Sequence, residues 1–153
     1  MKKLNLILIL LLLSSIAMAD QVDRILKHSS LGAVPNADLA KAIRKVSAKY
    51  GQNPDTVARI VMLESGGRAN AFNKESSDYG IMQINKLTSK LYGIDLKCLH
   101  NWQCNLDAGV MILADLSRYS SFRPCSYNIG PRRPKAIRLI KCLKYEQKLA
   151  SIN

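Results

Sequence analysis

Apolar side chains recur every three or four residues in several segments of the chain, which is the spacing of one face of an α-helix. In the first long segment, Asn36 is placed to cap a helix and Gly51 to end it. Its apolar positions are Leu39, Ile43, Val46 and Tyr50. The pattern therefore predicts an amphipathic helix over residues 36–50.

A second helix is predicted to follow at once. Asn53 is a suitable N-cap, and Pro54 fits the first helical position, where its missing N–H costs no hydrogen bond. The helix is expected to end at Gly66. One side of it carries Val57, Ile60, Val61 and, near its end, Glu64.

The remaining segments complete a mostly helical pattern. Helical spacing extends over about residues 21–30, 105–119 and 134–149. The polar stretch 68–79 is typical of turns, and residues 80–84 are expected to be a short extended run. The sequence contains no internal repeat or linker. It therefore predicts a single, mainly α domain with a short extended segment or small β element.

The first nineteen residues have the pattern of a signal peptide. Residues 1–3 are positively charged, residues 4–13 are almost all Leu and Ile, and Ala17 and Ala19 supply the small residues before a cleavage site. The alternative is a membrane anchor, but the apolar run is shorter than the roughly 20 residues that a spanning helix needs. We expect cleavage after Ala19, a mature domain over residues 20–153 and no stable membrane anchor.

Length and charge narrow the function classes. The 153 residues suit one globular domain, and 23 Lys and Arg against 11 Asp and Glu give a net charge of +12. A basic protein favours an anionic partner, which is nucleic acid, a membrane surface or an acidic polymer. Because an exported protein rarely meets nucleic acid, we expect no nucleic-acid partner. From Arg118 onward the chain holds nine basic residues and the single acid Glu146, which suits either a solvated face or a surface for an anionic envelope polymer.

Cysteine usage agrees with export. The chain has four cysteines, an even number that fits two disulfides in an oxidising compartment, with three pairings open. The two histidines lack the spacing of zinc ligands, and no C-x-x-C pair is present. We therefore expect no metal. The disulfide candidates are Cys98, Cys104, Cys125 and Cys142.

Glu64 is a carboxylate on the apolar side of a predicted helix, at the C-terminal end. Partial burial at this position and the negative end of the helix dipole would both disfavour the charged form, so we expect a raised pKa. A raised pKa is what a general acid working near neutral pH requires. The alternative on position alone is a helix-end Glu that points into water.

Four short motifs distinguish these interpretations. They are Glu64-Ser65-Gly66-Gly67, Tyr79 to Asn85, Asn105-Leu106-x-x-Gly109 and Ser126 to Gly130. In order and spacing these motifs resemble the soluble lytic transglycosylase (SLT) domain family, with its goose-lysozyme-like fold. The likeness covers about residues 52–130 and is nearest to the small exported transglycosylases associated with secretion, conjugation or pilus systems.

The resemblance implies a role for each matching residue. Glu64 matches the single catalytic acid/base, and Ser65 the hydroxyl beside it that helps line the cleft. Met82 and Gln83 match a strand segment that contacts the sugars, although Met82 also suits a core position. Tyr127 matches the family tyrosine near the catalytic carboxyl group, although it could also be a packed aromatic residue. Asn128 matches a polar contact to substrate, although it could also belong to an ordinary turn. Ile129 is bulkier than the family pattern.

The family's reaction explains a single carboxylate. The acid protonates the bond between N-acetylmuramic acid and N-acetylglucosamine, and the muramic C6 hydroxyl closes onto C1 as a 1,6-anhydro ring. No water and no cofactor is consumed. A second carboxylate would instead allow hydrolysis by a lysozyme-type muramidase. Glu75 and Asp78 lie near enough in sequence to supply one, although neither matches a catalytic position of the family.

The resemblance also implies the setting. We expect a periplasmic enzyme, or one secreted further, that acts on peptidoglycan glycan strands and serves local wall remodelling by a trans-envelope apparatus. The alternatives are a non-catalytic wall-binding or assembly protein with the same fold and, on charge alone, a cationic membrane-active protein. The fold that the resemblance implies is α+β and lysozyme-like, with the β element beside the cleft.

Overall fold

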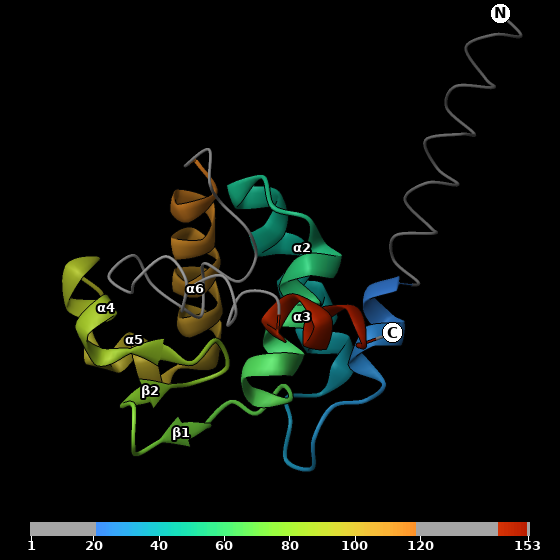
Figure 1. Ribbon diagram of the computed structural model, residues 1–153, viewed down its shortest axis with the longest axis horizontal. Helices are drawn as coiled ribbons and strands as arrows, with labels where there is room; N and C mark the ends of the chain where they lie inside the picture. Colours follow the sequence, from blue (N-terminus) through green and yellow to red (C-terminus); the bar gives the residue numbers. More distant parts are fainter. Residues whose placement is uncertain (1–20, 119–143, 153) are drawn as a thin grey trace, which may run out of the picture.

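The computed structural model describes residues 21–118 and 144–152, and it is mostly helical with one small sheet (Figure 1). This confirms the expected fold class. Short helical stretches lie at residues 21–26 and 144–150. The elements between them are α2 (Asn36–Tyr50), α3 (Pro54–Ser65), β1 (Phe72–Asn73), β2 (Asp78–Tyr79), β3 (Ile84–Asn85), α4 (Lys86–Leu91), α5 (Leu96–His100) and α6 (Trp102–Ser117).

The two predicted helices at residues 36–50 and 53–66 are confirmed as α2 and α3. The side chain of Asn53 accepts hydrogen bonds from the backbone N–H groups of Asp55 and Thr56 at 2.8 and 3.1 Å, as an N-cap should. The predicted cap of α2 is wrong. Pro35 is the N-cap of α2, and Asn36 is its first helical residue. The reason is that the Asn36 side chain accepts a hydrogen bond from the Ser29 hydroxyl at 2.7 Å instead.

The hydrophobic core lies where α2 packs against both α3 and α6. The apolar sides predicted for α2 and α3 face it. Most of these apolar side chains are buried, so the three helices form the centre of the core. The fully buried residues of this core include Leu39, Ile43, Val57, Ile60, Val61, Leu106 and Val110.

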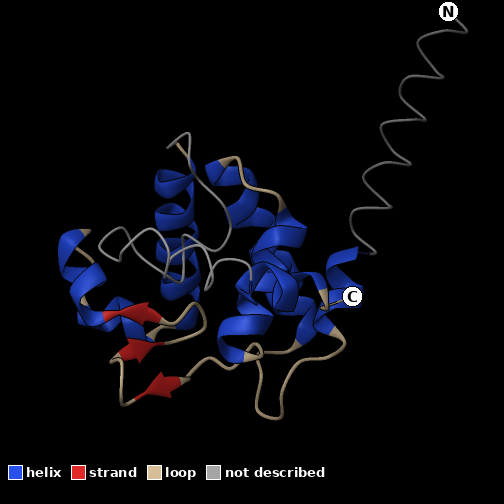
Figure 2. Cartoon of the chain, viewed as in Figure 1, coloured by secondary structure: helices blue, strands red, loops and turns tan. Residues whose placement is uncertain are grey.

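The small sheet is antiparallel in the order β1-β2-β3, at one side of the helical body (Figure 2). Residues that pair across strands share a face of the sheet. Phe72, Tyr79 and Ile84 form one face, whose last member is buried in the core. Asn73, Asp78 and Asn85 form the other face, which is therefore polar.

Two expectations for this region are corrected. The sequence predicts a turn-like stretch at 68–79; residues 69–70 and 74–77 are turns, but the stretch also contains β1 and β2. Residues 80–83 form a turn rather than an extended run, and only Ile84 and Asn85 are extended. The turn forms because Gly80 and Gln83 adopt positive φ angles of 73° and 47°.

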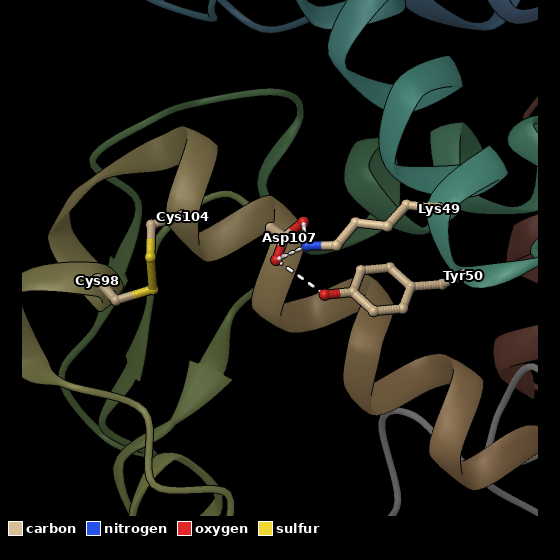
Figure 3. Close-up of polar contacts among 5 residues, drawn as sticks. All are labelled: Lys49, Tyr50, Cys98, Cys104 and Asp107. Atoms are coloured by element: carbon tan, nitrogen blue, oxygen red, sulfur yellow. Dashed lines mark hydrogen bonds and ion pairs between the residues drawn. A yellow bond between two sulfur atoms is a disulfide. The ribbon is translucent and has the colours of Figure 1, made fainter.

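Two short helices, α4 and α5, lead from the sheet to α6. A disulfide joins Cys98 of α5 to Cys104 in the first turn of α6. Asp107 of α6 accepts hydrogen bonds from the Lys49 ammonium at 2.7 and 2.9 Å and from the Tyr50 hydroxyl at 2.9 Å (Figure 3). These contacts fix the start of α6 against the end of α2.

The predicted helix at 105–119 is confirmed with an earlier start, at Trp102, because Asn101 caps it through a 2.9 Å bond to the Cys104 N–H. Of the helix expected at 134–149, residues 144–150 are helical and the rest lies outside the described residues. None of the helices in the described ranges has both the length and the apolar character needed to cross a bilayer.

Candidate active site

Glu64 lies in the last turn of α3 and is half-buried. The hydroxyl of Tyr145, from the C-terminal helix, donates a hydrogen bond to Glu64 Oε1 at 3.0 Å. Figure 1 shows this C-terminal helix, in red, lying beside α3. The bond holds the carboxyl group in one orientation at the end of the helix.

Ser65, the next residue, connects α3 to the turn at residues 80–83. Its hydroxyl donates to the carbonyl oxygens of Val61 and Ile81, at 3.2 and 2.8 Å, and accepts from the Gly67 N–H at 3.1 Å. The side chain is only 3% exposed. Ser65 therefore fixes the position of its neighbour Glu64 relative to the turn from within the core.

Gln83 closes the turn. Its backbone N–H and its side-chain Nε2 both donate to the Gly80 carbonyl, at 3.1 and 2.9 Å, and Nε2 also donates to Ala71 O at 3.2 Å. A positive φ is uncommon for glutamine and occurs where surrounding contacts enforce it, often at functional sites. The half-buried amide is thus held rigidly beside the sheet.

Asn105 of α6 organises the other side of the turn. This fully buried side chain accepts from the Met82 N–H at 2.9 Å and donates to the carbonyls of Tyr79 and Leu99 at 3.0 and 3.1 Å. All three partners are backbone groups, so the amide substitutes for secondary structure in satisfying them. The second and third motifs of the sequence meet here.

The structure brings some predicted site residues together but not all of them. Glu64 and Ser65 share the end of α3, and Met82 and Gln83 lie in the turn that Ser65 contacts. Met82 has no exposed surface, which favours its core interpretation. Tyr127 and Asn128 lie outside the described residues, as do Cys125 and Cys142.

The two alternative carboxylates differ in their surroundings. Glu75 is exposed in the β1–β2 connection. Asp78 lies on the polar face of the sheet, where its carboxylate accepts from Asn85 Nδ2 at 2.8 Å and also from the Ser76 hydroxyl. These hydrogen bonds hold the Asp78 carboxylate in one orientation.

Tyr145 could not be found from the sequence pattern. It is 81 positions from Glu64, and no local pattern links the two. One signal was present: Tyr145 and Leu149 are four residues apart, so a helix brings them to one face, and both are buried.

Within residues 21–118 and 144–152, no three His, Cys, Asp or Glu side chains are grouped to hold a metal ion.

Comparison with known families gives a match to the transglycosylase SLT domain over residues 41–146, which is more than half of the chain. The match includes α3, the sheet, α6 and the start of the helix at 144–150. Comparison with curated proteins and with solved structures gave no match. The chain belongs to the transglycosylase SLT domain family and is a lytic transglycosylase, a glycosidic-bond lyase that acts on peptidoglycan.

Proposed function

We propose that Glu64 is the catalytic acid/base and that the enzyme cleaves the β-1,4 bond between N-acetylmuramic acid and N-acetylglucosamine. The observation that carries this is the hydrogen bond from the Tyr145 hydroxyl to the Glu64 carboxyl group at the end of α3. A general acid works only when its carboxyl group is held toward the bond that it protonates. Ser65 and Tyr145 supply that constraint from two directions.

The reaction needs one proton donor that later accepts a proton. Glu64 gives its proton to the glycosidic oxygen, and the bond from this oxygen to C1 of the muramic residue breaks. The C6 hydroxyl of the same residue then attacks C1 and gives its proton to Glu64. The products are a 1,6-anhydromuramic end and a free 4-hydroxyl on N-acetylglucosamine, and the enzyme is returned to its starting protonation state. Holding the sugar so that its own hydroxyl attacks is a proximity effect.

The test is a digest of purified peptidoglycan by residues 20–153, with the products identified by mass spectrometry. We expect anhydromuramyl products from the wild type and at least a hundredfold less from Glu64→Gln, since removal of a general acid typically costs 10²–10⁴-fold. Asp38→Asn is the matched control, because it changes an exposed carboxylate in the first turn of α2. Undiminished product from Glu64→Gln would exclude this role for Glu64.

A second candidate reaction is hydrolysis, as in a muramidase. It is favoured by one observation, the Asp78 carboxylate that Asn85 and Ser76 hold on the polar face of the sheet. A hydrogen-bonded, partly solvated carboxylate suits the second group of a two-carboxylate glycosidase. If this reaction operates, the digest yields reducing muramic ends, and Asp78→Asn abolishes them. If the lyase reaction operates, Asp78→Asn still forms anhydro ends.

We further propose that the enzyme is exported by residues 1–19 and acts in the periplasm, or beyond it, in local wall remodelling for a secretion, conjugation or pilus apparatus. The leader pattern, the even number of cysteines and the basic C-terminal segment support this. Expression of the full chain in a Gram-negative host tests the export. We expect the protein in the periplasmic fraction with Asp20 as its N-terminus, and cytoplasmic protein beginning at Met1 would contradict it.

A further inference from the structure

Arg59 connects α3 to the last turn of the C-terminal helix. Its Nη1 donates hydrogen bonds to the carbonyl oxygen of Leu149 in that turn, at 3.1 Å, and to that of Ile152, two residues beyond the helix. The last four carbonyls of a helix have no partner within the helix, and a cation nearby also interacts favourably with the helix dipole. The half-buried guanidinium of Arg59 therefore caps this helix end.

The same two segments meet again at the site. Arg59 contacts Leu149 and Ile152, and Glu64 contacts Tyr145. The sequence order is reversed between the two segments, so they run antiparallel along this contact. At 1.5 Å per residue, the five-residue step from Arg59 to Glu64 spans about 7.5 Å, and the four-residue step from Tyr145 to Leu149 about 6 Å. The two contacts thus hold the C-terminal helix at both ends of one short interface.

Burial makes this interface stiff. Tyr145 and Leu149 are 7% and 8% exposed and face the core from consecutive turns. The phenol ring of Tyr145 therefore moves with the helix that carries it. A displacement of about 1 Å at a catalytic constellation is enough to cost up to a hundredfold in rate.

We propose that Arg59 is a positioning residue for the transglycosylase reaction: by capping the helix at residues 144–150, it places the Tyr145 hydroxyl on the Glu64 carboxyl group. This inference rests on the proposed role of Glu64. Arg59 touches no reacting atom and acts through Tyr145. Loss of the cap leaves the carbonyls of Leu149 and Ile152 without the guanidinium, and the helix shifts to find other partners.

The test compares kcat and KM on soluble glycan strands for Arg59→Gln, Tyr145→Phe and the double variant. We expect each single variant to lower kcat by about tenfold with KM nearly unchanged, and to shift the pH profile of kcat/KM in the same direction. Because Arg59 acts through Tyr145, the double variant should be no slower than Tyr145→Phe alone. Arg59→Lys should recover part of the rate, since one ammonium can donate to one of the two carbonyls.

Arg44→Gln is the matched control. Arg44 lies on α2 and forms an ion pair with Asp23 at 2.9 Å, so this variant removes an arginine from a different helix than Arg59. We expect its rate and pH profile to equal those of the wild type. A second readout is independent of catalysis: the ¹⁹F resonance of fluorotyrosine placed at position 145 should move in Arg59→Gln and stay in place in Arg44→Gln.

Three outcomes would overturn the proposal. The first is that the kcat losses of the two single variants multiply in the double variant. The second is that the ¹⁹F resonance does not respond to Arg59→Gln. The third is that the rate of Arg59→Gln falls only in proportion to its folded fraction, measured by circular dichroism, while its pH profile stays unchanged. A fully active Glu64→Gln variant overturns the proposed function of Glu64 instead. The ¹⁹F measurement then still reports whether Arg59 positions Tyr145.

Discussion

Gly80 occupies a position where a side chain has no room. Its φ is +73°, and a Cβ atom there would lie 2.4 Å from Asn105 Nδ2 and 2.8 Å from the Leu99 carbonyl oxygen. Asn105 cannot move away, because it holds three backbone groups from the core. A glycine at this position is therefore required both by the backbone angle and by the close approach of α6.

The prediction is that Gly80→Ala lowers the free energy of unfolding by about 3 kcal/mol or more, from left-handed strain and overpacking together. Gly93→Ala is the matched control: its φ is +64°, and an added Cβ atom would have no other atom within 4 Å, so only the backbone strain of about 1 kcal/mol remains. Urea unfolding measures both. Equal losses would show that the contact with Asn105 has no energetic consequence.

Individual residues were predictable to different degrees. Glu64 was conspicuous because a carboxylate on an apolar helix side violates the hydrophobic pattern. Gln83 gave no hint of its positive φ, which follows from contacts with Gly80 and Ala71 that form only in the fold. Tyr145 was missed for the same reason, since its partner Glu64 is 81 positions away. Local rules find residues that break a pattern, and they do not find residues that become important through distant contacts.

At the scale of elements, length decided what the sequence could predict. The helices α2 and α3 have 15 and 12 residues, enough for a periodic apolar side and recognisable caps. The strands have two residues each, too few for any alternation to be visible. The helices α4 and α5, with six and five residues, span less than two turns. They form because Asn85 and Asp95 cap them, and α5 also packs against α6.

The contact between α2 and α6 is predicted to weaken at alkaline pH. The hydrogen bond to Asp107 raises the pKa of Lys49 above its ordinary value of 10.5, with smaller contributions from Tyr50. A raised pKa in the folded state means that the stabilisation is fully present below pH 10.5 and is lost as the pH rises through the folded value. The effect is small, because the ammonium is exposed to solvent.

Urea midpoints of the wild type and Lys49→Met test this at neutral pH and above about pH 11. We expect the wild type to have the higher midpoint at neutral pH, and the difference to shrink at alkaline pH. Lys45→Met is the control, because Lys45 is another exposed lysine of α2. A difference that persists in the alkaline buffer would show that the Lys49 charge is not its source.

At the scale of the whole molecule, the disulfide between Cys98 and Cys104 limits how the other two cysteines can pair. The bond between Cys98 and Cys104 removes two of the three pairings that the sequence left open. If two disulfides form, as the even count predicts, the second joins Cys125 to Cys142. Mass spectrometry of a non-reduced proteolytic digest should find this linked peptide pair. A peptide linking Cys104 to Cys125, or free thiols in the exported protein, would contradict it.

Charge is a second property of the whole chain, and it bears on the substrate. Lys and Arg exceed Asp and Glu by twelve, and eight of these charges lie from Arg118 onward. Peptidoglycan carries lactyl and peptide carboxylates, so long-range attraction should raise the amount of enzyme at the wall. Such attraction is screened over about 10 Å in 0.1 M salt and over about 3 Å in 1 M salt.

We therefore predict that binding to insoluble peptidoglycan weakens by roughly tenfold when the salt concentration rises from about 0.1 M to about 1 M. The Glu64→Gln variant is used so that cleavage does not consume the substrate during the measurement. Chitin is the control polymer, because it has the same backbone linkage without the carboxylates, and its binding should change little with salt. If binding to peptidoglycan is insensitive to salt while the circular dichroism stays constant, the basic C-terminal segment has no part in holding the substrate. Contacts at the site would then have to supply the affinity.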